Sequence, residues 1–123
     1  MGAKMKLHEK AWHYGFARVL PPDGIAGLRA ALESNDNRLV QHHAACPVGS
    51  PDYRCTAADA IGFAVWSPGD TVAQVGLKWI NAIAEACKLT GEIGSFITWY
   101  DCTPRDEMRR TLMRMIDTRT QET

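Results

Sequence analysis

Three short helix-start motifs constrain the fold of this chain more than any other feature of its sequence. In each, a serine or threonine stands three residues before an aspartate, so its hydroxyl group can accept a hydrogen bond from the third amide of the helix. The motifs are Thr56 with Asp59, Ser67 with Asp70, and Thr103 with Asp106. In the last two, a proline follows the serine or threonine directly and occupies the first helical position, where its missing N–H is not needed. The sequence therefore predicts three helices that begin at 56, 67 and 103.

The spacing of apolar residues predicts how far these helices extend. The last helix is expected to run from Thr103 to about Thr118. Four apolar residues share one of its faces: Met108, Leu112, Met115 and Ile116. From Ser67 a longer helix reaches Lys88, and residues 56–66 are apolar almost all round, which is typical of a buried central helix.

The remaining segments give one more helix and a small β element. A helix is expected over Ile25–Ser34, with Ile25, Leu28, Ala31 and Leu32 facing the core. Residues 38–45 resemble a strand, and residues 53–55 are its expected return arm across the turn PVGSPD. Residues 12–20 fit either a strand or a helix, and residues 94–100 form an apolar segment of undetermined type.

The composition is that of a chain that folds into one domain. A length of 123 residues, with 46% hydrophobic and 23% charged residues, is typical of a single globular domain. We therefore predict one compact domain over residues 1–123, mostly α with a small antiparallel β element (α+β) and about four helices. Residues 1–10 and 119–123 are expected to be flexible ends.

Charge, hydropathy and cysteine content exclude several classes of protein. The 14 basic residues balance the 14 acidic ones, whereas general nucleic-acid-binding proteins usually carry a basic excess. No apolar stretch approaches the roughly 18 residues of a membrane span, and the polar N-terminus does not resemble a secretory signal. Four cysteines without an export signal are typical of reduced thiols. We expect a cytoplasmic protein that binds neither membranes nor nucleic acids in general.

Two segments carry a resemblance to a known family. In the first, a strand and a polar turn lead to Cys55 and the helix containing Ala60 and Ile61; in the second, Trp99 and Asp101 precede the C-terminal helix. Over about residues 25–118 this order resembles a family of small bacterial and phage proteins with the patterns C-x-x-G-A-[IL] and W-N-D-x-P-x-R-T. The chain departs from these patterns at Ala58, Asp59, Tyr100, Cys102 and Thr103. The family has no established activity, so the resemblance implies the fold and no particular function.

The segment RLVQHHAACPVGSPDYRC, residues 38–55, holds the residue types of a metal site. His42, His43, Cys46 and Cys55 suit zinc, but eight residues separate the two cysteines, more than in the usual zinc motif. Adjacent strand residues point to opposite faces, so at most one histidine would join such a site, and the two histidines cannot both face water. The alternative is structural, with Cys55 as a small buried side chain and the histidines as polar strand residues.

A cysteine nucleophile is the second hypothesis for this part of the chain. Cys55 and Cys102 each precede an expected helix N-terminus, where the helix dipole lowers the pKa of a thiol, and His42 or His43 could act as the base. No catalytic signature surrounds either cysteine. We therefore predict no catalytic residues and no cofactor, with a small cysteine- or metal-dependent enzyme as the alternative. Asp59 is interpreted as part of a helix cap rather than as a buried catalytic carboxylate.

The C-terminal helix carries the best candidates for a binding site. Arg110 and Arg114 are i, i+4 neighbours that could hold a phosphate together, and Trp99 and Tyr100 upstream could contact a nucleotide base. The alternative is a solvated face on which each arginine has a nearby acidic partner: Asp106 for Arg110 and Asp117 for Arg114. The predicted ligand-binding residues are Trp99, Tyr100, Arg110, Arg114, His42 and His43.

The sequence thus favours a small binding protein without a catalytic role. We expect a phage or mobile-element accessory factor that binds either an anionic, nucleotide-like small molecule or a host protein. Trp12, Tyr14 and Phe16 form an aromatic cluster whose exposed part would be covered by homo-oligomerisation. A purely structural or assembly subunit is a further alternative.

Overall fold

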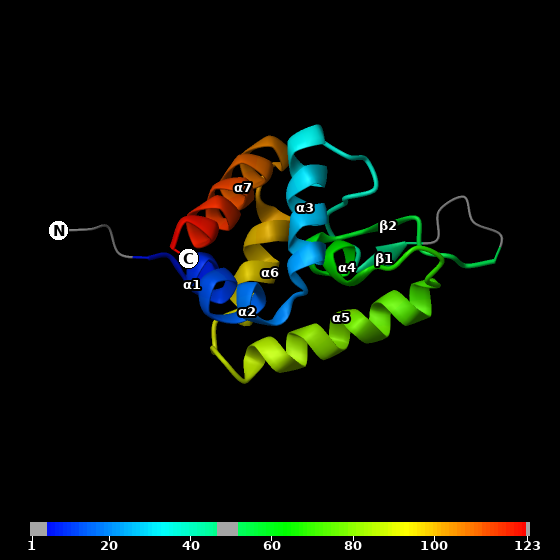
Figure 1. Cartoon of the computed structure of the whole chain (residues 1–123), viewed down its shortest axis with the longest axis horizontal. Helices are drawn as coiled ribbons and strands as arrows, with labels where there is room; N and C mark the ends of the chain where they lie inside the picture. The colour runs from blue at the N-terminus through cyan, green and yellow to red at the C-terminus, as the bar shows by residue number, and fades with distance from the viewer. Residues whose placement is uncertain (1–4, 47–51, 123) are drawn as a thin grey trace.

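The computed structural model describes residues 5–46 and 52–122, with side chains as far as residue 118, and confirms a mostly helical fold with a small antiparallel sheet. The helices are α1 (Leu7–Ala11), the π-helical turn η1 (Trp12–Phe16), α2 (Ala17–Val19), α3 (Pro22–Ser34), α4 (Ala60–Val65), α5 (Val72–Cys87), α6 (Ile93–Cys102) and α7 (Arg105–Glu122). The strands are β1 (Ala45–Cys46) and β2 (Ala57–Ala58). In Figure 1, α3, α6 and α7 lie together, with α1 and α2 at one end, α4 and the sheet at the other, and α5 along the bottom. Within the described residues, no helix is both long enough and apolar enough to cross a membrane.

Helix α5 begins five residues after the predicted Ser67. The Ser67 amide donates to the Asp70 carboxylate at 2.9 Å, and Gly69 adopts a left-handed φ of 88°, so this motif forms a turn instead of a helix start. The true cap is Thr71, and its partner is Gln74, the third residue of the helix. The Thr71 hydroxyl oxygen accepts a hydrogen bond from the Gln74 amide at 3.2 Å, and the Thr71 amide donates to the Gln74 side chain. The capping motif of Thr71 and Gln74, downstream of Ser67, therefore sets the start of α5.

The other two helix starts lie closer to their predicted positions. Asp59, and not Thr56, caps α4: its carboxylate accepts from the Gly62 amide at 2.8 Å. The Thr56 hydroxyl donates instead to the carbonyl oxygen of Cys46 at 3.2 Å. Helix α7 begins at Arg105, within a residue of the expected proline, and the predicted apolar face of α7 is confirmed because all four of its residues are buried.

The β element is shorter than predicted and differently paired. Ala45 lies opposite Ala58, and Cys46 lies opposite Ala57. The expected strand over 38–45 is wrong in extent, because His42 adopts a left-handed φ of 76° that interrupts extended structure. The expected return arm, residues 53–55, is not the partner strand. The predicted turn falls mostly on residues 47–51, which lie outside the described residues.

The N-terminal segment is helical throughout residues 7–19, which resolves the ambiguity of residues 12–20. Trp12 and Phe16 are both fully buried, whereas Tyr14 between them exposes 43% of its surface. The spacing of i and i+4 brings the two buried rings to one side of the helical run. Two of the three rings of this aromatic cluster are therefore part of the core, and Tyr14 is its exposed member.

Helix α6, whose type the sequence left undetermined, lies at the centre of the aromatic core. Phe96 is buried and contacts four other rings, with centroid distances between 5.2 and 6.1 Å. These rings belong to Trp12, Phe16, Trp99 and Tyr100. The core thus joins the N-terminal helical run to α6, and this contact fixes one wall of the candidate site.

Two glycines allow α4 to pack closely against its neighbours. A Cβ atom on Gly24 of α3 would overlap the carbonyl oxygen of Ala64, and a Cβ atom on Gly62 would overlap the carbonyl oxygen of Ala44. Any side chain at either position would force the backbone apart. Glycine is therefore required at both crossings.

Candidate functional site

A groove between α1 and α7 brings together part of the predicted binding site. It has a volume of about 450 Å³. Its lining residues are Lys6, His8, Glu9, Trp99, Glu107, Arg110, Thr111 and Arg114. We call this the α1–α7 groove, and Figure 1 shows the two helices next to each other. Of the six predicted ligand-binding residues, Trp99, Arg110 and Arg114 lie in it.

Arg110 and Arg114 do not form the ion pairs that the solvated-face alternative requires. The carboxylate of Asp106 lies 3.4 Å from Arg109, and that of Asp117 lies 2.9 Å from Arg29 of α3. Within the described residues, neither groove arginine has a salt bridge, and both are exposed. Their guanidinium groups therefore remain available to an anion.

The groove has a small excess of positive charge. Lys6 adds a third cation to the two arginines, whereas Glu9 and Glu107 supply two negative charges. The Glu9 carboxylate accepts a hydrogen bond from the Lys6 amide at 3.2 Å, which holds this acid at the start of α1. The resulting electrostatics suit one compact anionic group better than an extended polyanion.

An aromatic pair forms the end of the groove. The rings of His8 and Trp99 stack with their centroids 4.5 Å apart and their planes at 4°. Burial lowers the pKa of His8 below its ordinary value of 6.5, and Lys6 lowers it further while Glu9 opposes this effect. The imidazole is therefore mostly neutral at pH 7, and it can gain a proton when an anion binds beside it.

The same ring pair borders a second, uncharged groove of about 600 Å³. Besides His8 and Trp99, the residues that line it are Leu7, Gly91, Gly94, Ser95 and Thr98. None of these five residues carries a charge. A charged groove and an uncharged groove thus meet at one aromatic pair, so a ligand with an anionic end and a neutral ring could contact both.

Two further arginines of the C-terminal helix, Arg105 and Arg109, stabilise the fold. Arg105 donates to Asn35 Oδ1 and to the carbonyl oxygens of Asp36 and Leu39, at 2.7 to 2.9 Å. Arg109 donates to the carbonyl oxygens of Leu32 and Glu33, at 2.8 and 3.2 Å. These bonds satisfy carbonyl groups at the C-terminal end of α3 and in the loop that follows it. The guanidinium groups of both arginines are therefore occupied by these hydrogen bonds and are not available to bind a ligand.

Tyr100 lies apart from the groove although it is adjacent to Trp99 in sequence. It exposes only 2% of its surface, and its hydroxyl group donates to the carbonyl oxygen of Val40 at 2.7 Å. Burial raises the pKa of Tyr100 above its ordinary value, with Asp59 adding to the effect. In this structure the side chain is a buried hydrogen-bond donor.

His42 and His43 lie on a different part of the surface from the groove, and both are exposed. The expectation that one of them faces the interior is wrong, because the left-handed backbone at His42 removes the strand alternation on which it rested. The His42 amide donates to the Asp101 carboxylate at 2.8 Å, which holds this loop against α6.

Cys46 and Cys55 do not have the environment of reactive thiols, whereas Cys102 is exposed. Burial raises the pKa values of both Cys46 and Cys55, and the Cys55 thiol lies 3.3 Å from the carbonyl oxygen of Ala57. A raised pKa keeps a thiol protonated, which disfavours both nucleophilic attack and metal binding. In the part of the chain that the structure describes, no group of three His, Cys, Asp or Glu side chains could hold a metal ion.

Asp59 is the one buried carboxylate in the described structure. Besides capping α4, it accepts a hydrogen bond from the indole Nε1 of Trp79 at 3.2 Å. Burial raises the pKa of Asp59 from 3.8 to about 7, although its hydrogen bonds from Gly62 and Trp79 oppose this shift. Asp59 does not line either of the two grooves described above.

Sequence reasoning missed the contribution of α1 to the groove. Lys6 and His8 fall in the segment that was expected to be a flexible end. The available signal was the i, i+4 spacing of His8 and Trp12, which is that of one helix face. Comparison with protein-family models, with curated proteins and with solved structures gave no match, so the site rests on the geometry described above.

Proposed function

We propose that this protein binds a small anionic ligand of the nucleotide type in the α1–α7 groove. The observation that carries the proposal is the pair of arginines without acidic partners beside the His8–Trp99 ring pair. A phosphate group would accept hydrogen bonds from Arg110 and Arg114, and Lys6 would add charge. The neutral ring of the ligand would lie against the aromatic pair toward the uncharged groove.

Calorimetric titrations with inorganic pyrophosphate, ADP and adenosine test the two halves of this site separately. We expect ADP to bind most tightly, pyrophosphate more weakly and adenosine weakest, because only ADP offers both the charge and the ring. Equal affinity for ADP and pyrophosphate would remove the aromatic part of the proposal. The absence of binding by all three compounds would refute the nucleotide-like site, and a protein partner would then be favoured.

Replacement of the groove arginines is expected to weaken ADP binding strongly. Arg110→Gln and Arg114→Gln should each raise Kd by about tenfold, since each removes a charge-assisted hydrogen bond. Arg18→Gln is the matched control, because Arg18 is exposed on α2, lies 5.5 Å from the Tyr14 ring and is outside the groove. Unchanged affinity in the Arg110→Gln/Arg114→Gln double variant would contradict the proposal.

Binding is also expected to tighten as the pH falls. The pKa of His8 is lowered in the free protein by burial, and a bound anion would raise it, so binding takes up a proton. Affinity should therefore increase by up to about tenfold as the pH falls toward the lowered pKa of His8. His8→Gln, measured with the same ligand, corrects for titration of the ligand itself. Identical pH profiles for the two proteins would show that His8 does not face the anion.

We also propose a cytoplasmic location. Its support is that all four cysteines are free thiols, at positions 46, 55, 87 and 102, two of them exposed. Exposed free thiols are typical of proteins in reducing compartments.

A further inference from the structure

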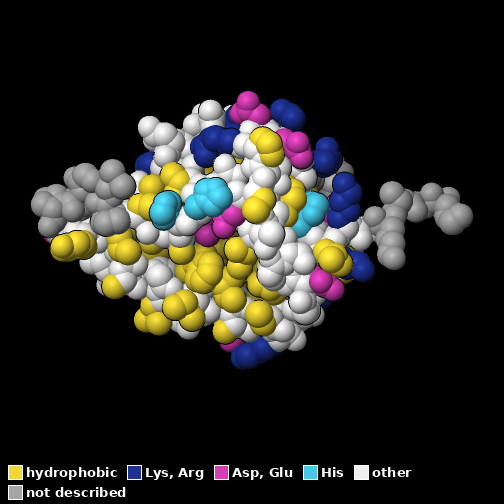
Figure 2. Space-filling view, turned by 180° about the vertical axis from the view of Figure 1, so that it is seen from behind, with side chains coloured by type: hydrophobic (Ala, Val, Ile, Leu, Met, Phe, Trp, Pro, Cys, Tyr) yellow, Lys and Arg dark blue, Asp and Glu magenta, His cyan; other side chains and the backbone are white. Residues whose placement is uncertain are grey.

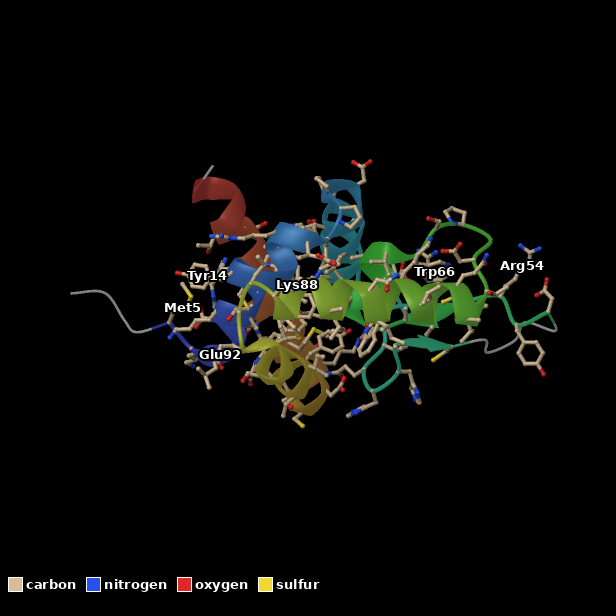
Figure 3. The ribbon with its side chains drawn as sticks, turned by 90° about the horizontal axis from the view of Figure 1, so that it is seen from below. Met5, Tyr14, Arg54, Trp66, Lys88 and Glu92 are labelled. Atoms are coloured by element: carbon tan, nitrogen blue, oxygen red, sulfur yellow. The ribbon has the colours of Figure 1, made fainter. Side chains whose placement is uncertain are left out.

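Helix α5 carries an apolar stripe on its solvent-facing side. The members of the stripe are Ala73, Leu77, Ile80, Ala84 and Cys87, all of them exposed. Leu77 and Ile80 expose 62% and 58% of their surface. We call these five residues the α5 stripe. In Figure 3, seen from below, α5 is the helix that runs across the view.

The spacing of the α5 stripe is that of a helix-pairing seam. Successive members are four, three, four and three residues apart, which is the heptad pattern of coiled coils. The two other faces of α5 have clear roles. The core-facing residues are Val75, Ala82 and Ala86, and the polar residues are Gln74, Lys78, Asn81 and Glu85. The α5 stripe is thus a second apolar seam on the same helix, in addition to the one that packs on the core.

The apolar surface continues from the α5 stripe toward the core. Trp79 and Ile83 of α5 are partly buried and pack against the core cluster. Figure 2 shows hydrophobic side chains gathered on the lower half of the rear face, at the level where Figure 1 places α5. Monomeric proteins rarely expose apolar areas of this kind without a partner.

We propose that the α5 stripe binds a second copy of this chain, with the two α5 helices antiparallel about a twofold axis between Leu77 and Ile80. In this arrangement Leu77 of each copy packs against Ile80 of the other, and Ala73 packs against Ala84. The small alanines at both ends let the two helices approach closely, and the large side chains fill the middle. The stripe is therefore complementary to itself.

The charges at the ends of α5 are compatible with the antiparallel arrangement. Lys88 follows the C-terminal end of α5, and Asp70 lies just before its N-terminal end. Within each copy, Lys88 pairs with Glu85 at 3.0 Å and Asp70 pairs with Lys78 at 2.7 Å. Antiparallel helices therefore bring together two ends whose charges are already neutralised, so no like-charge repulsion opposes the pairing.

The size of the seam indicates how tightly the two copies associate. A helix of 16 residues is about 24 Å long. Stable interfaces bury about 800 Å² on each partner, and a single helix face lies at or below the low end of this range. We therefore expect a dimer that forms at micromolar concentration and dissociates on dilution. None of the stripe residues lines the α1–α7 groove, so this proposal is independent of ligand binding.

Sedimentation velocity over the micromolar range tests the association directly. The wild-type chain is expected to shift from monomer to dimer with rising concentration, and a chain that stays monomeric throughout would overturn the proposal. Leu77→Glu is expected to raise the dimer Kd by on the order of 100-fold, because the substitution occurs twice in each dimer. Leu7→Glu, at a residue 52% exposed on α1, is the matched control and should leave association unchanged.

Cysteine cross-linking tests the predicted geometry without relying on a destabilising change. In a chain with Cys87→Ser and Cys102→Ser, the double substitution Ala73→Cys/Ala84→Cys should give an oxidised dimer, since these positions face each other. The single substitution Ala73→Cys should not give an oxidised dimer, because residue 73 of the second copy lies at the far end of the seam. Rapid cross-linking of the single variant would show parallel helices, and failure of both variants to cross-link would show that the α5 stripe is not the interface.

Discussion

Replacement of Phe96 by alanine is expected to lower the free energy of unfolding by about 3–5 kcal/mol. The loss is large because the ring is buried and contacts four other aromatic rings, so its removal leaves a cavity that its neighbours cannot close. The total stability of a domain of this size is on the order of 5–15 kcal/mol, so this single substitution removes a large fraction of it.

Urea denaturation followed by circular dichroism measures this change. Leu7→Ala is the control, since it removes an apolar side chain that is 52% exposed and should change stability by less than about 1 kcal/mol. Phe96→Leu should fall between the two, because it keeps part of the buried volume. A loss below about 1 kcal/mol in Phe96→Ala would contradict the central position of α6 in the core.

The stability of the wild-type protein is expected to fall as the pH rises from about 4 to about 7, relative to Asp59→Asn. Burial raises the pKa of Asp59 from 3.8 to about 7, so the folded chain binds this proton more tightly than the unfolded chain does. The stabilisation from the proton is complete below the unfolded pKa and is lost as the pH approaches the folded pKa. The full difference amounts to up to about 4 kcal/mol.

Asparagine is the appropriate replacement because it still caps the helix but does not titrate. Unfolding free energies of Asp59→Asn and wild type, measured at matched pH values, should therefore diverge across this window, whereas parallel curves would show that Asp59 is ionised in the folded protein.

Asp70→Asn is a control for which the expected pH dependence of stability has the opposite sign. The hydrogen bond from Lys78 holds the pKa of Asp70 below 3.8, so its contribution is lost as the pH falls through the acid range. Burial lowers the pKa of His8, so its contribution to stability changes with pH in the opposite direction to that of Asp59, and it is present in both proteins.

The parts of the fold that were predictable are those that local chemistry specifies. The last helix combines a proline near its start with a regular apolar face, and both features act within a few residues. Helix α6 lacks such signals, because residues 93–100 are apolar or small on all sides and suit a strand equally well. Its helical form depends on ring contacts with residues about eighty positions earlier, which no short pattern contains.

The candidate site was predictable only in part, for a similar reason. Local spacing offered Arg110 and Arg114 acidic partners on their own helix, but a distant arginine, Arg29, takes Asp117. Tyr100 was placed with Trp99 because the two are adjacent in sequence. Once α6 is known to be a helix, adjacent residues point about 100° apart, which directs Tyr100 into the core and Trp99 toward the groove.

The α1–α7 groove joins segments that lie about a hundred residues apart in the chain, and this has a consequence for folding and dynamics. Lys6 and His8 can meet Arg110 and Arg114 only after almost the whole chain has folded, so a molecule that has not docked its first helix has no binding site. A bound ligand that contacts both sides opposes separation of the two helices, and it stabilises only the docked state. Ligand binding would therefore slow amide hydrogen exchange most at the two ends of the chain, the regions that otherwise open most readily.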